Sequence, residues 1–118
     1  MAMPAGETDP ISALKTAERF TIGRVGFAAS ESSAELALRA LLAKPEPAKT
    51  LEGLVESATI AGRLYALLGL KRANSPAFET SLPCFLIDDT PVETMEGCVA
   101  RQTTAGEIAR DIQAGKFR

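Results

Sequence analysis

The chain of 118 residues contains no histidine and no tryptophan, and aromatic residues make up only 5% of it. Without histidine, it lacks the side chain that most often acts as a general base near neutral pH and that most often binds metals. Any catalysis would depend on a cysteine, carboxylate, lysine, tyrosine or serine, with no imidazole to activate a nucleophile. The sequence therefore argues against an enzyme, and we expect no cofactor or metal.

Neither sign of charge dominates, since 13 basic residues stand against 15 acidic ones, a net charge of -2. Nucleic-acid binding draws most of its affinity from a concentrated basic field, so this balance argues against a nucleic-acid partner. No run of roughly 18 apolar residues exists, and we expect no membrane span. The first ten residues contain no apolar signal core. The sequence as it stands predicts a cytoplasmic protein, or an exported one if a signal was removed.

The strongest pattern in the chain lies between residues 50 and 74, where apolar residues recur at steps of three and four around most of a helix. Such a helix cannot lie on a surface, so we expect it to be the packed centre of the domain. Thr50 is expected to cap it, and Asn74 to end it. A bend near residues 57–59 would divide the segment into two helices. The side chains expected to be dry are Leu64, Tyr65, Leu67 and Leu68.

Shorter helices are predicted on both sides of this segment by their start signals. Asp9-Pro10 and Ser75-Pro76 each place a capping residue before a proline at the first helical position. Residues 32–35 and residues 104–107 read as capping boxes. Pro83 is expected to end the helix that starts at Ser75, because proline removes a backbone donor and clashes with the preceding turn.

Residues 84–98 change period and predict a short β-hairpin or an irregular element. An apolar run at residues 85–87 would form one strand, residues 88–91 the turn, and residues 92–95 the returning strand. The fold class expected is mainly α: a compact bundle or array of about five short helices around a buried central helix. Residues 1–8 are expected to be a flexible tail, and residues 9–118 a single globular domain.

Two resemblances accompany this pattern. The stretch AGRLYALLGL at residues 61–70, with Gly97-Cys98 further on, resembles a family of small bacterial proteins, and that resemblance implies no activity. The succession of short helices joined by proline-containing corners over residues 32–82 resembles helical-repeat pairs of the HEAT type in architecture.

Cys84 and Cys98 are the candidate disulfide of this chain. A bond between them would close a short loop and stabilise the chain by about 3 kcal/mol in the chain-entropy model. Their spacing is unlike the CxxC motif of thiol oxidoreductases. The alternative is a pair of small buried apolar residues, since free cysteine is among the most buried residue types.

A cluster of acidic residues around the expected turn is the other candidate for chemistry. Carboxylates gathered on a turn can bind a divalent cation or act as an acid and base pair. No spaced calcium-loop pattern is present, so an ordinary acidic turn with solvated side chains is the alternative. The members of the cluster are Asp88, Asp89, Glu93 and Glu96.

Arg63, Lys71 and Arg72 would leave the central helix on its wetter side and are the candidate partner-facing residues. A solvated helix face that complements the helix dipole is the alternative. Together the observations favour a non-enzymatic helical domain that binds another protein, for example an immunity or antitoxin-like protein. The alternatives are an exported structural or envelope protein stabilised by a disulfide, and a small enzyme that depends on a thiol or a carboxylate.

Overall fold

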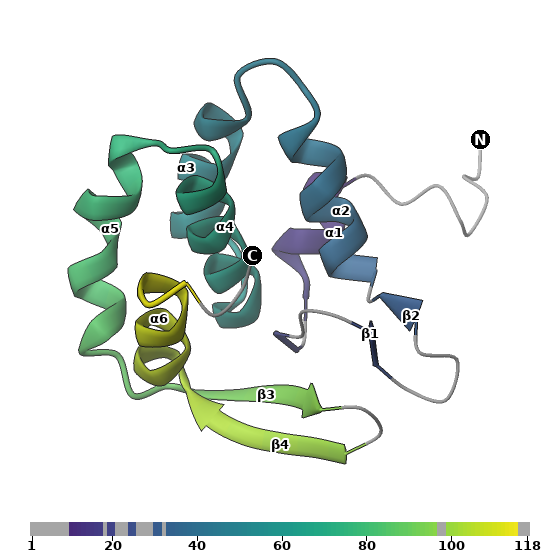
Figure 1. Ribbon diagram of the computed structural model, residues 1–118, viewed down its shortest axis with the longest axis vertical. Coiled ribbons are helices and arrows are strands. Elements are labelled where there is room, and N and C mark those ends of the chain that lie inside the picture. The colour runs from purple at the N-terminus through teal and green to yellow at the C-terminus, as the bar shows by residue number, and fades with distance from the viewer. Residues whose placement is uncertain are drawn as a thin grey trace.

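Six α-helices and two antiparallel strand pairs make up the part of the chain that the computed structural model describes, residues 10–17, 19–20, 24–25, 30–31, 33–96 and 99–115 (Figure 1). The expected tail at residues 1–8 lies outside these residues. The elements in chain order are α1 (Pro10–Lys15), β1 (Arg24–Val25), β2 (Ser30–Glu31), α2 (Ser33–Leu42), α3 (Pro47–Ser57), α4 (Ile60–Arg72), α5 (Pro76–Leu86), β3 (Pro91–Glu96), β4 (Val99–Thr104) and α6 (Ala105–Gln113).

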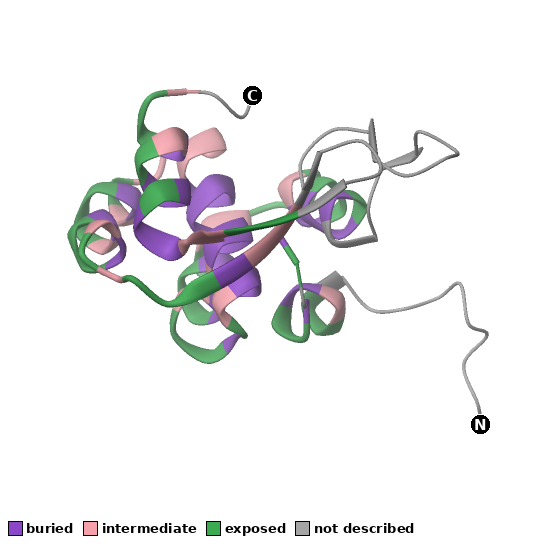
Figure 2. Ribbon diagram, turned by 90° about the horizontal axis from the view of Figure 1, so that it is seen from below, coloured by how far each residue is buried: buried purple, intermediate pink, exposed green. Residues whose placement is uncertain are grey.

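Helix α4 forms the centre of the fold and contacts each of the other five helices of the described chain. In Figure 1, α5 and α6 lie on one side of it and α1 and α2 on the other. The four side chains expected to be dry have no exposed area. In Figure 2 the buried stretches gather where the helices face one another. The prediction of a buried central helix with about five helices around it is confirmed. Those four residues are Leu64, Tyr65, Leu67 and Leu68.

The break expected near residues 57–59 is present, and Thr59 explains it. Its hydroxyl oxygen accepts a hydrogen bond from the amide of Gly62 at 3.2 Å and so caps α4. The same hydroxyl donates to the carbonyl of Ala17, and the Thr59 amide donates to the carbonyl of Lys15 at 2.9 Å. Thr59 therefore starts α4 and fastens it to the end of α1.

The expected helix start at Thr50 is wrong, because α3 begins at Pro47. Proline fits the first helical position, where its missing amide hydrogen would have had no partner and its fixed φ matches the helix. The residue before it, Glu46, has a left-handed φ of 54°. At the other end of the segment Asn74 has φ 56°, the conformation of a residue that ends a helix, as predicted.

The expected end of α5 at Pro83 is also wrong, because the helix continues to Leu86. Proline removes one intrahelical hydrogen bond. Against that cost, a continuous helix keeps Phe78, Leu82 and Phe85 on one buried face, with 7%, 4% and 6% of their surface exposed. Burying a large apolar side chain is worth about 1.5–3 kcal/mol, so the tertiary contact of Phe85 offsets the local penalty.

A β-hairpin is present, as predicted, but with other strands. Helix α5 takes up most of the expected first strand at residues 85–87, and the hairpin pairs β3 with β4. Its register is unbroken from Pro91 opposite Thr104 to Glu96 opposite Val99. The expected second strand, residues 92–95, therefore lies in β3, the first strand of the hairpin. Its partner, β4, follows it in the chain.

The hairpin is fastened to the helices at its β3 side and at the start of α6. The amide of Phe20 donates to the carbonyl of Glu93 at 2.9 Å. The amides of Ala105 and Gly106 donate to the carbonyls of Thr90 and Asp88, at 3.0 and 2.7 Å. These bonds satisfy amides that have no partner within α6 and fix the loop between α5 and β3.

The capping box expected at residues 104–107 is confirmed in its first half. The Thr104 hydroxyl oxygen accepts from the amide of Glu107 at 3.3 Å, which caps α6. The Glu107 carboxylate accepts from the Thr103 hydroxyl at 2.5 Å. Ser75 caps α5, as predicted, since its hydroxyl oxygen accepts from the amide of Ala77 at 3.2 Å. Two further predicted capping residues, Asp9 and Ser32, lie outside the described residues.

Candidate functional site

A groove of about 730 Å³ lies between α3 and α5, with one side chain from α4. Helices α3 and α5 contact each other, and both pack on α4. The lining residues described are Glu52, Val55, Glu56, Arg63, Ala77, Thr80, Ser81, Cys84, Phe85 and Asp88.

Helix α5 and the residues after it supply most of the lining, in a single stripe. The stripe follows steps of three and four, so the helical period places its members on one face. Its polar groups are hydroxyls, a thiol and a carboxylate beside the apolar surface of Ala77 and Phe85. The stripe is Ala77, Thr80, Ser81, Cys84, Phe85 and Asp88.

Helix α3 contributes the facing side of the groove through residues at the same helical spacing. Val55 is half-buried and adds to the apolar lining, while Glu52 and Glu56 are exposed. No motif in the sequence marks these three residues as functional. Their spacing of three and four was readable, but nothing in the sequence states that α3 would face α5.

Arg63, one of the candidate partner-facing residues, lies in this groove. Its Nε donates to the carbonyl oxygen of Ala58 at 3.0 Å, and its Nη2 donates to the carbonyl oxygen of Glu56 at 3.4 Å. Both acceptors belong to the C-terminal end of α3, where carbonyls have no partner within the helix and a cation complements the dipole. Arg63 therefore stabilises the junction between α3 and α4, and it also lines the groove.

Asp88 is held at the end of the groove by an Asx turn. One carboxylate oxygen accepts from the amide of Thr90 at 2.9 Å and from the Thr90 hydroxyl at 2.5 Å. The hydroxyl and amide hydrogen bonds from Thr90, together with the positive charge of Arg63, lower the pKa of Asp88. The groove thus holds three carboxylates against one guanidinium.

Cys84 lies exposed in the groove on α5. The alternative prediction, that Cys84 is a small buried apolar residue, is therefore wrong. Cys98 lies outside the described residues. The disulfide between them stays a prediction.

Lys71 does not line the groove, and its side chain caps the C-terminal end of α6. Its Nζ donates to the carbonyl oxygens of Ile112 and Gln113, at 2.5 and 3.2 Å. These carbonyls close the C-terminal turn of α6, where an ammonium group is stabilising. A role for Lys71 toward a partner stays a prediction.

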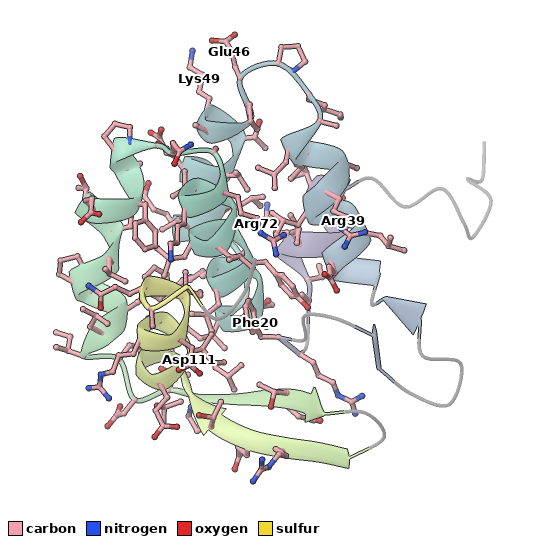
Figure 3. The ribbon with its side chains drawn as sticks, in the orientation of Figure 1. Phe20, Arg39, Glu46, Lys49, Arg72 and Asp111 are labelled. Atoms are coloured by element: carbon pink, nitrogen blue, oxygen red, sulfur yellow. The ribbon has the colours of Figure 1, made fainter. Side chains whose placement is uncertain are left out.

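Arg72 lies between α4 and α2, on the side that faces Arg39 (Figure 3). Burial lowers the pKa of Arg72, while the carboxylate of Glu35 raises it and the charge of Arg39 lowers it. Glu35 is itself 2% exposed, and its carboxylate lies 3.7 Å from the guanidinium of Arg39. Arg72 thus belongs to a charged cluster in which Glu35 is buried and Arg39 is exposed. A role for Arg72 toward a partner stays a prediction.

The described side chains of the acidic cluster around the turn do not gather in one place. Asp88 belongs to the groove, and Glu93 pairs with Arg19 at 2.8 Å on the outer side of β3. Asp89 is exposed, and the side chain of Glu96 lies outside what the structure describes. Within the described part of the chain, no three histidine, cysteine or acidic residues are placed to hold a metal ion.

Comparison of the chain with protein families, with curated proteins and with solved structures finds no match. None of the helices in the described ranges is long and apolar enough to cross a membrane. The groove combines apolar side chains, hydroxyl groups and an excess of carboxylates, and these groups are the basis for inferring its function.

Proposed function

We propose that this protein is a non-enzymatic helical domain that binds a basic segment of another protein in the groove between α3 and α5. The observation that carries the proposal is the α5 stripe, which presents apolar and hydroxyl groups in a row opposite the carboxylates of α3. A small, mildly acidic immunity or antitoxin-like protein is a specific case.

Charge complementarity supports a basic partner. Glu52, Glu56 and Asp88 give the groove a negative field, and the only cation of its described lining, Arg63, is directed to two backbone carbonyls. Opposite potentials across an interface speed association and exclude partners of the wrong charge. Binding is therefore expected to weaken as ionic strength rises.

Apolar contact supports a segment that carries aliphatic or aromatic side chains beside its basic ones. Val55, Ala77 and Phe85 line the groove between the polar groups. Protein interfaces combine an apolar core with a polar rim, and most binding energy comes from a few anchors that fill such a core. A helix or an extended peptide with alternating basic and apolar residues fits this arrangement.

Site-specific photo-crosslinking tests the proposal. A photo-reactive amino acid replaces Thr80, inside the groove, and in a control it replaces Glu79, the neighbouring residue that is exposed and does not line the groove. We expect one protein to be captured from Thr80 and not from Glu79. Equal capture from both positions would contradict the proposal.

Direct binding of the captured segment then tests the chemistry. The double variant Glu52→Gln with Glu56→Gln is expected to weaken binding roughly tenfold at low salt, because the complementary charges are lost. Glu79→Gln removes one carboxylate outside the groove and is expected to leave the affinity unchanged. Cys84→Ser is expected to bind normally, whereas a thiol-dependent enzyme would lose its activity.

A further inference from the structure

We infer that β4 is a self-association edge, through which two copies of this chain pair their β4 strands in antiparallel order. The observation behind this inference is a difference between the two edges of the hairpin. Among the described residues the sheet order is β3 beside β4 only, so β4 has no neighbour on its other side. In Figure 1, β4 runs along the outer border of the molecule.

The β3 edge is closed. Pro91 at its start has no amide hydrogen to offer, and the carbonyl of Glu93 accepts from the amide of Phe20 at 2.9 Å. Proline and covering segments are the ordinary means by which proteins protect sheet edges. Strand β4, with the sequence VARQTT, contains no proline, glycine or lysine, and its register has no bulge.

The hydrogen bond at Glu93 identifies which groups β4 presents. Because the Glu93 carbonyl points away from β4, Glu93 and the residue opposite it, Gln102, form a non-hydrogen-bonded pair. The amide and carbonyl of Gln102 therefore point away from β3, to the open side. The alternation of an antiparallel ladder gives the same direction to Ala100 and Thr104. A free edge of this kind is a template for another strand.

The sequence of β4 allows a second copy to pair with it in antiparallel order, and its one charged residue disfavours one of the registers. An antiparallel pair of β4 strands that joins the outward groups can place Gln102 opposite Gln102 of the second copy, with Ala100 opposite Thr104. Arg101 then lies opposite Thr103, so no like charges meet. A shift by two residues in one direction would place Arg101 opposite Arg101, and like charges directly opposite each other destabilise a sheet. The opposite shift would place Thr103 opposite Thr103. The strand is thus self-complementary about Gln102, and the product is a sheet of order β3, β4, β4, β3.

Analytical ultracentrifugation over a concentration series tests the inference, and we expect the mass to rise from the 12.4 kDa chain to twice that value. Gln102→Lys places two ammonium groups together at the symmetry axis and is expected to weaken the dimer roughly threefold to tenfold at low salt. Mixing Gln102→Lys with Gln102→Glu is expected to restore association. Gln113→Lys adds the same charge at an exposed position of α6 and should change nothing.

Amide hydrogen exchange gives a second readout that needs no variant. The amides of Gln102 and Ala100 are expected to become more protected as the concentration rises, while that of Arg101, already bonded within the hairpin, is not. Gln102→Pro removes the outward amide and is expected to abolish association with the helical signal unchanged. The inference would be overturned if the chain stayed monomeric over the whole concentration series, or if Gln102→Lys left the affinity of the dimer unchanged. It would also be overturned if the amide of Gln102 became protected only on addition of an unrelated peptide.

Discussion

Two glycines lie inside adjacent helices and meet opposite surroundings. A Cβ atom on Gly62 of α4 would lie 1.9 Å from the carbonyl oxygen of Leu14, whereas one on Gly53 of α3 would have no atom within 4 Å. At Gly62 the backbone of α1 approaches α4 too closely for any side chain. At Gly53 the glycine only leaves the unfolded chain more freedom.

Alanine at the two positions should therefore act in opposite directions. Gly53→Ala is expected to raise the free energy of unfolding by roughly 0.5–1 kcal/mol, the usual gain in an exposed helix. Gly62→Ala is expected to lower it by about 1–3 kcal/mol, because the added methyl group forces α1 and α4 apart. Urea denaturation followed by circular dichroism measures both. Effects of the same sign would contradict the close approach of the two helices.

The protonation of Asp88, a groove residue, makes the stability of the fold depend on pH. Hydrogen bonds from Thr90 hold its pKa in the folded chain below the ordinary value of 3.8. The stabilisation that follows is complete above that ordinary value, and it is lost as the pH falls through the lower folded-state pKa. Thr90→Val removes the hydroxyl donor and is expected to shift the pKa of Asp88 upward in an NMR titration. Thr80→Val is the control, since that hydroxyl donates to the Pro76 carbonyl and is not among the groups that shift the pKa of Asp88.

At the scale of elements, α6 is held at both ends by groups from elsewhere in the chain. The carbonyls of Thr90 and Asp88 accept from its first amides, and Lys71 donates to its last carbonyls. A helix of nine residues is too short to be stable alone, so these end contacts and its buried face decide whether it forms.

Lys71→Met keeps much of the apolar stem and removes the cation from the end of α6. We expect the free energy of unfolding to fall by roughly 1–2 kcal/mol, because two charge-assisted hydrogen bonds to helix carbonyls are lost. Hydrogen exchange should accelerate in the last turn of α6 before it does in α4. Lys49→Met makes the same change at an exposed position of α3 and is expected to leave both measurements unaltered. If exchange rose equally in all helices, Lys71 would not be a local cap.

At the scale of the whole molecule, one apolar cluster joins all six described helices and β3. A cluster shared by these seven elements predicts a single cooperative unfolding transition. The groove belongs to the surface of that unit, and so does the open edge of β4, on different elements. Gln102→Lys should therefore leave binding in the groove intact, and the groove variants should leave self-association intact.

Leucine-to-alanine substitutions test the shared core. Leu67 has no exposed surface, whereas Leu36 is 52% exposed on α2. Leu67→Ala is expected to lower the free energy of unfolding by about 2–5 kcal/mol, since it removes buried methyl groups and leaves a cavity. Leu36→Ala is expected to change it by less than about 0.5 kcal/mol. A small effect at Leu67, or separate transitions for different helices, would contradict a core centred on α4.

Much of the fold could be predicted from the chain itself, because local chemistry decides it. A segment apolar around its circumference has to be buried, and residues 61, 62 and 64–70 of α4 are. Thr104 and Asn74 act at helix ends because of their own side chains and backbone preferences. Only part of the groove could be predicted: the expectations named Arg63, Cys84 and Asp88, but not the carboxylates of α3.

Only the tertiary structure decided the remaining features, and the physical reason is the same for each. Burial of Phe85 carried α5 through Pro83, which local preference alone would not do. The same extension places most of the expected first strand in α5, and β3 pairs with β4 instead. The sequence by itself determined which segments are apolar, where several helices begin and end, and which residue types are absent. Which helices face each other, which cations serve helix ends and which sheet edge stays open depend on contacts between distant residues, whose energies exceed local preferences and are not encoded in spacing.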